Sequence, residues 1–123
     1  ASQGPRFFGF VVGGSPPVAT AAEWMTAAWD QVTGFNRLSP AAAAAEEVTR
    51  RWLATLLGVP QDAPFGYTTG RQMAHFSALA AARHHVLAQR GWDVEAQGGG
   101  RTADRVVAPE ERHSTVDRVL RFL

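Results

Sequence analysis

The stretch from Phe65 to Phe76 constrains the fold of this chain more than any other. Residues 65–69 are rich in aromatic and β-branched side chains, which favours a short β-strand. Gly70 permits a sharp turn, and residues 71–90 are almost all helix formers. Where a strand leads into a helix N-terminus, free N–H groups and the helix dipole converge and favour an anion. We therefore expect an anion site at the start of this helix.

The remaining elements follow from turn residues and hydrophobic spacing. Thr20 is a candidate cap for a helix over 21–32. Ser39-Pro40 is a strong helix start, and Gly58 ends the helix that it begins. The sequence predicts a single domain with an extended arm over 1–17, two helices within 18–58, a strand-turn-helix over 65–90, a loop over 91–104, and a strand and helix over 105–123.

Composition excludes several classes of function. The net charge of +1 provides no strong field for nucleic acid or an anionic membrane, so neither is expected as a partner. There is no Cys, and hence no disulfide or thiolate metal site. All twelve basic residues are Arg, so the chain has no side-chain amine for a Schiff base. No apolar run reaches about 18 residues and no signal peptide is visible, so a cytoplasmic location is expected.

Six segments in a fixed order carry a resemblance to a known family. They are Arg6-Phe7-Phe8-Gly9-Phe10 with Gly13-Gly14-Ser15; Trp29-Asp30-Gln31; Ser39-Pro40-Ala41-Ala42-Ala43 with Glu46-Glu47-Val48; Thr68-Thr69-Gly70 with Met73-Ala74; Ala78-Leu79-Ala80-Ala81-Ala82-Arg83; and Glu110-Glu111-Arg112-His113-Ser114. This order resembles the group II pyridoxal-phosphate-dependent amino-acid decarboxylases, which include the aromatic-amino-acid and glutamate decarboxylases. It covers the early portion of that family's large domain.

The resemblance implies a cofactor site. In the family the strand–Gly–helix turn holds the cofactor phosphate, which here implies Thr69, Gly70, Arg71 and Gln72. A histidine that stacks on the pyridine ring corresponds to His113. The family's Schiff-base lysine and the aspartate that pairs with the ring nitrogen lie beyond residue 123.

The turn also departs from the family pattern. Arg71, Gln72 and His75 stand where the family usually has a small residue, a hydroxyl residue and Asn. Arg71 either adds a charge-assisted contact to the phosphate or blocks its pocket. Together with the absent lysine, these departures argue against an intact pyridoxal-phosphate site.

The resemblance also predicts the architecture. The expected fold is mainly α with short β-strands, a truncated fragment of the α/β large domain of fold-type I pyridoxal-phosphate enzymes. The family's first two strands are not neighbours, so strand edges and apolar helix faces would stay uncovered. Such surfaces favour self-association. We expect a rearranged homo-oligomer, most simply a two-fold dimer.

Histidines offer a second kind of site. His75 and His85 are ten residues apart, about 15 Å along one helix, and cannot share a metal within a straight helix. An antiparallel crossing of two copies near Ala80 would bring His75 of one chain level with His85 of the other. His113 is a third candidate ligand, and Asp117 follows it at a spacing that can share a helical face.

These residues suggest a metal-dependent hydrolase. Without Cys, a site of His and carboxylate favours zinc or another divalent metal, which would activate water against a phosphate or carboxylic ester. Arg71 would be electrophilic support, and Glu111 or Asp117 a ligand or general base. Two alternatives stay open: a non-catalytic remnant that binds phosphate or pyridoxal phosphate and works only with the missing part of a decarboxylase, and an inert self-associating domain.

Overall fold

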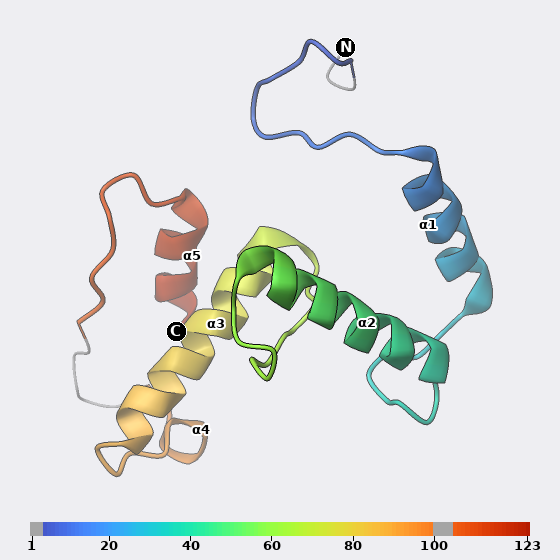
Figure 1. The fold of residues 1–123 in the computed structure, drawn as a ribbon. Helices are drawn as coiled ribbons and strands as arrows, with labels where there is room; N and C mark the ends of the chain where they lie inside the picture. Colours follow the sequence, from blue (N-terminus) through green and yellow to red (C-terminus); the bar gives the residue numbers. More distant parts are fainter. Residues whose placement is uncertain (1–3, 100–104) are drawn as a thin grey trace. The chain divides into compact units, whose positions relative to one another are not determined.

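A computed structural model describes residues 4–99 and 105–123. The regular secondary structure in these ranges is all α-helical, and turns and extended segments connect the helices (Figure 1). The helices are α1 (Pro17–Trp29), α2 (Pro40–Leu57), α3 (Gly70–Ala88), α4 (Val94–Gln97) and α5 (Ser114–Phe122). The chain divides into two compact units, residues 1–63 and 64–123. Each unit is described by itself, and the single domain predicted for residues 1–123 stays a prediction.

Helix α1 begins earlier and ends earlier than its predicted span of 21–32. Pro17 occupies the first helical turn, where its missing N–H costs nothing. Thr20 therefore lies inside the helix, and its hydroxyl is 3.1 Å from that of Ser15. The helix ends after Trp29 because Asp30 adopts a left-handed conformation with φ of 47°. The predicted capping role of Thr20 is wrong.

Helix α2 confirms the predicted span of 40–57. Pro40 is at its first turn, and Gly58 ends it at a φ of 67°, donating its N–H to the carbonyls of Ala54 and Thr55. Ser39 stands at the N-cap position but makes no capping hydrogen bond, and its buried hydroxyl has no partner among the described residues. The boundary was therefore predicted correctly, while the expected capping contact does not form.

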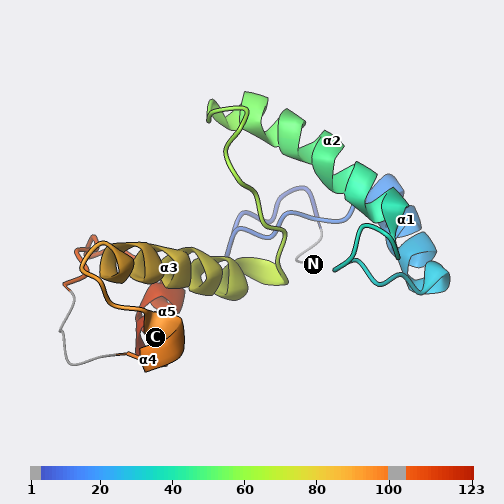
Figure 2. The same ribbon diagram turned by 90° about the horizontal axis from the view of Figure 1, so that it is seen from below.

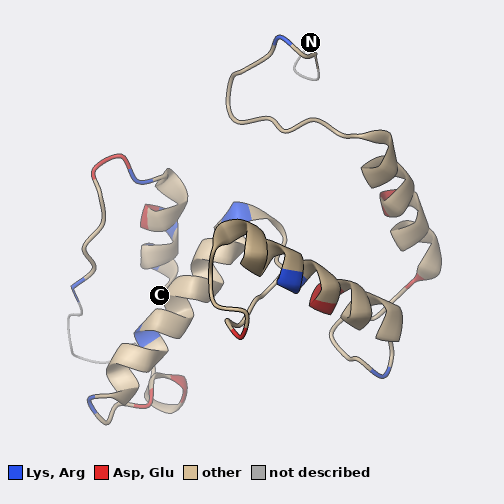
Figure 3. Cartoon of the chain, in the orientation of Figure 1, with Lys and Arg blue, Asp and Glu red and all other residues tan. Residues whose placement is uncertain are grey.

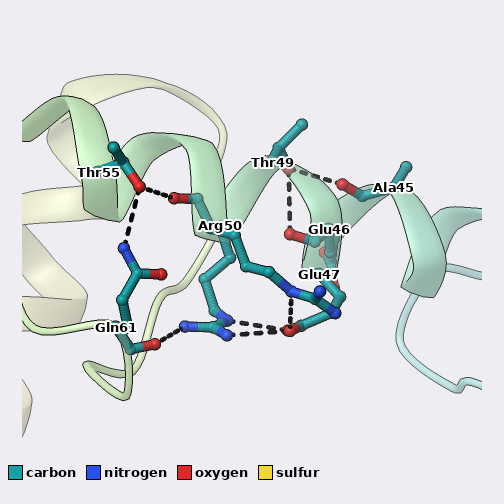
Figure 4. Close-up of polar contacts among 8 residues, drawn as sticks. Ala45, Glu46, Glu47, Thr49, Arg50, Thr55 and Gln61 are labelled. Atoms are coloured by element: carbon teal, nitrogen blue, oxygen red, sulfur yellow. Dashed lines mark hydrogen bonds and ion pairs between the residues drawn. The ribbon is translucent and has the colours of Figure 1, made fainter.

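A network of hydrogen bonds and ion pairs lies on the exposed face of α2 (Figure 4). Glu47 accepts hydrogen bonds from Arg50 and Arg51, each with a nitrogen–oxygen distance of 2.8 Å. Arg50 also donates to the carbonyl of Gln61, whose side chain donates to Thr55 at 3.0 Å. The hydrogen bonds from Arg50 and then Arg51 lower the pKa of Glu47 to about 2. The network ties the helix to the segment that follows it.

The apolar stripes of α1 and α2 are not covered by the described residues. Trp52 and Leu56 of α2 remain 68% and 80% exposed, and Trp24 and Trp29 of α1 are exposed as well. The two helices make no packing contact with each other. Self-association through these exposed side chains stays a prediction.

The second unit has a small core built on α3. Helices α4 and α5 both contact α3 (Figures 1 and 2). The buried apolar side chains of this unit are Leu87 of α3, Val94 of α4 and Val119 of α5. Val119 is 0% exposed and belongs to α5, which packs against α3. This packing determines where the N-terminus of α5 lies.

Helix α4 interrupts the segment predicted as a loop over 91–104. Asp93 caps it by accepting from the N–H groups of Glu95 and Ala96 at 3.0 and 3.2 Å. The Trp92 indole N–H donates to the carbonyl of Gly98 at 3.1 Å, which closes the turn. Residues 100–104 of the predicted loop lie outside the described residues.

The predicted strands over 65–69 and 105–108 are absent. Both segments are extended or irregular, and no strand occurs anywhere in residues 4–99 and 105–123. A strand requires a ladder with a neighbouring strand, and neither segment forms such a ladder within the part of the chain that the structure describes. The expectation of a mainly helical chain is confirmed, whereas the expected short strands are not observed in the described residues.

Charges are mixed along both units, with arginines interspersed among the acidic residues (Figure 3). None of the helices in the described ranges combines the length and apolar character that a membrane span needs. The mixed charges mark no strongly charged surface on the described residues of either unit.

Candidate functional site at the start of helix α3

The start of α3 has the glycine turn that the sequence predicts for an anion site, although the strand expected before it is absent. Gly70 is the first helical residue at a φ of +78°, and its N–H donates to the carbonyl of Thr68 at 2.9 Å. Thr69 precedes it and makes no side-chain capping bond. The first N–H groups of an α-helix have no partner within the helix, so those of Arg71 and Gln72 stay available here. A Cβ added to Gly70 would meet nothing within 4 Å, so the space beside the turn is open.

Two further side chains belong to this turn. Arg71 is exposed, which leaves its guanidinium able to reach a bound anion. Gln72 is half-buried, yet both polar atoms of its amide are inaccessible to solvent and unpartnered within the described residues. An unsatisfied buried amide costs free energy unless a ligand or water completes its hydrogen bonds. Thr69, Gly70, Arg71 and Gln72 are consecutive at the start of α3, and their role in holding a cofactor stays a prediction.

Two of the predicted histidines meet next to this turn through a residue that was not predicted. The Nδ1 atom of His75 lies 2.8 Å from the hydroxyl oxygen of Thr115. The Nδ1 atom of His113 lies 2.9 Å from the same oxygen. Thr115 is only 8% exposed, because it sits in the contact between α5 and α3. One hydroxyl therefore joins histidines that are 38 positions apart.

Local structure explains the position of His113. This residue is the N-cap of α5, and its Nδ1 accepts a hydrogen bond from the N–H of Thr115 at 3.2 Å. The capping bond fixes the ring beside the first turn of α5, while Val119 one turn later packs that helix against α3. His75 lies in the second turn of α3 and faces the same contact.

The other predicted site residues lie apart from this pair. His85 is exposed, and its Nε2 is 2.9 Å from the side-chain nitrogen of Gln89. Asp117 pairs with Arg112 at 2.7 Å, so it is engaged in an ion pair on the surface. Glu111 is exposed.

No group of three His, Cys, Asp or Glu side chains able to hold a metal occurs within residues 4–99 and 105–123. The proposed ligands His75, His85 and His113 therefore do not come together in one chain. His85 is two to three turns from His75, and Nδ1 of His113 is already an acceptor for Thr115. A metal shared between two chains stays a prediction, as do the catalytic roles of Arg71, Glu111 and Asp117.

Thr115 is the residue that sequence reasoning missed. It is 40 positions from His75, and such a contact depends on how two helices pack rather than on spacing within either. The available signal was its place two residues after His113, where capping hydrogen bonds to a helix N-terminus occur.

An apolar pocket of about 550 Å³ lies elsewhere in the second unit. Its wall includes Leu79, Val86 and Leu120, and three arginines, Arg83, Arg90 and Arg105, also line it. None of the residues of the α3 turn or of the histidine pair contributes to it. The pocket is therefore separate from the candidate site.

Comparison with known proteins supports the resemblance that the sequence segments indicated. The chain is 30% identical to an aromatic-L-amino-acid decarboxylase from Bacillus atrophaeus over 125 residues, which is 97% of this chain and 23% of that protein. The chain is similar to part of a group II decarboxylase. It spans less than a quarter of the length of this decarboxylase relative. No protein-family model matches the chain, and no solved structure matches it.

Proposed function

We propose that this chain is a phosphate-binding segment of a group II decarboxylase-like protein. In this proposal the N-terminus of helix α3 binds the phosphate of pyridoxal phosphate. The observation that carries the proposal is the open, uncapped helix start at Gly70, within the stretch that is similar to the decarboxylase relative. An anion there would accept from the backbone N–H groups of Arg71 and Gln72, which have no partner within the helix. The relation to a decarboxylase makes this cofactor the natural candidate.

The residues fit the phosphate end of the cofactor. Gly70 leaves space for an anion close to the backbone, since nothing lies within 4 Å of the missing Cβ. Arg71 would add a charge-assisted hydrogen bond, which suits a phosphate better than its family counterpart, a small residue, would. His113 is the candidate for contact with the pyridine ring. Pyridoxal phosphate, when bound, supplies the electron sink for decarboxylation.

These 123 residues would bind and orient the cofactor but would not catalyse decarboxylation by themselves. There is no lysine among them, so none of them can form a Schiff base with the cofactor. The other three-quarters of the decarboxylase relative has no counterpart in this sequence. We infer that activity requires a lysine from outside these residues, in agreement with the second of the functions weighed from the sequence.

The test is a calorimetric titration of the 123-residue chain with pyridoxal phosphate, and separately with inorganic phosphate. Saturable binding of both, in competition with each other, is expected. Arg71→Ala should weaken both by about fivefold, since an exposed charge-assisted contact is worth about 1 kcal/mol.

Arg37→Ala is the matched control, because it removes the same charge from an exposed position in the first unit. It should leave both affinities unchanged. Equal weakening by the two variants would show that only net charge matters, and absence of competition by phosphate would refute the proposed site.

A further inference from the structure

The three contacts at Thr115 allow one complete assignment of hydrogens. The backbone N–H of Thr115 can only donate, so Nδ1 of His113 is an acceptor and carries no hydrogen. The hydroxyl of Thr115, 2.9 Å from that same nitrogen, must then be the donor in their contact. A hydroxyl has one hydrogen, which this contact uses.

The remaining contact is thereby determined. With its hydrogen used, the Thr115 oxygen can only accept from Nδ1–H of His75, which lies at 2.8 Å. The opposite direction would set two lone pairs against each other at 2.9 Å between Thr115 and His113. The hydrogen bonds therefore run in one direction, from His75 through Thr115 to His113.

The two rings consequently hold different tautomers. Neutral His75 carries its hydrogen on Nδ1, and neutral His113 carries its hydrogen on Nε2. Among the described residues, Nε2 of neither ring has a hydrogen-bond partner. His113 thus presents an N–H donor from a ring whose other nitrogen is fixed from two sides.

We propose that His75 is a positioning residue which, through the Thr115 hydroxyl, fixes the tautomer and ring orientation of His113 for the ring end of a bound pyridoxal phosphate. The ligand part of this inference rests on the proposed function. In that proposal the turn at Gly70 holds the phosphate end, so His75, Thr115 and His113 govern only the part of the ligand beyond the phosphate. A pyridine ring bearing an oxygen acceptor is the chemistry that this donor would recognise.

The first test reads the tautomers directly and needs no ligand. The ring nitrogens of ¹⁵N-histidine-labelled protein are observed by long-range ¹H–¹⁵N NMR at about pH 8, where an unperturbed imidazole is neutral. His75 should be the Nδ1–H tautomer and His113 the Nε2–H tautomer. In Thr115→Val, which keeps the shape of the side chain and removes the hydroxyl, His75 should shift toward Nε2–H. Finding His75 as Nε2–H in the unaltered chain would overturn the proposal.

The second test separates positioning from phosphate binding. His75→Leu removes the donor to Thr115 and should weaken pyridoxal phosphate several-fold while leaving inorganic phosphate unchanged. His75→Asn places an amide nitrogen near the position of Nδ1 and should restore the affinity. Circular dichroism checks that each variant keeps its helices.

The outcomes are distinguishable from failure of the proposed function. If neither ligand binds the unaltered chain, the proposed function fails, and the tautomers still decide the hydrogen-bond assignment. If both ligands bind but the Asn and Leu variants behave alike, the positioning role of His75 is refuted while the phosphate site stands.

Discussion

Replacing Val119 by alanine tests whether the small core of the second unit holds the candidate site together. Val119 is 0% exposed and packs α5 against α3, so truncation removes two buried carbons. Lost transfer free energy of about 0.8 kcal/mol per carbon, together with a cavity contribution, outweighs the helix propensity of about 0.5 kcal/mol that alanine gains. We expect a loss of about 2 kcal/mol in the free energy of unfolding.

The assay is urea denaturation followed by circular dichroism, with Val107→Ala as control. Val107 belongs to the same unit and is 89% exposed, so its truncation should change the free energy of unfolding by less than about 0.5 kcal/mol. Because Val119 also fixes the start of α5, its loss should disturb the NMR signals of His113. Equal stabilities for the two variants would refute the packing of α5 on α3.

Two further predictions concern the helix ends and the network on α2. Hydrogen bonds from Arg50 and then Arg51 lower the pKa of Glu47 to about 2 from its ordinary value of 4.5. The contribution of Glu47 to stability is therefore complete above pH 4.5 and is lost as the pH falls through about 2. ¹³C NMR of the carboxyl group should show titration near pH 2, and titration near pH 4.5 would contradict the network. Gly70→Ala should cost about 1 to 2 kcal/mol because φ is +78°, although the added methyl meets no atom; urea denaturation measures this, and an unchanged midpoint would show that the turn relaxes freely.

Local signals predicted most helices well, and their failures have local causes. Helix α2 was predicted at both ends because Pro40 and Gly58 impose their own backbone angles. Helix α1 was shifted because Pro17 was interpreted as the end of the arm rather than the first turn of the helix. Helix α4 was missed because the glycine-rich segment that follows it favoured a loop, although Asp93 is a typical N-cap residue and Gly98 a typical helix end.

The absence of the strands and the contact between the two histidines depend on tertiary contacts, which the spacing of residues along the sequence does not reveal. Residues 65–69 have the composition of a strand, yet strand formation needs a neighbour that the described residues do not provide. The turn at Gly70 was predicted because glycine adopts a positive φ at little steric cost. The contact between His75 and Thr115 arises from the packing of α5 on α3, so no pattern within either helix reveals it.

The most direct test of the central claim is to locate the bound anion by ¹H–¹⁵N NMR of the backbone amides during titration with pyridoxal phosphate. Saturable shifts are expected at the amides of Gly70, Arg71 and Gln72, and inorganic phosphate should reproduce them. The additional signals moved by pyridoxal phosphate alone should include His113. Shifts confined to arginines elsewhere in the chain, or no saturable shift at the start of α3, would contradict the account.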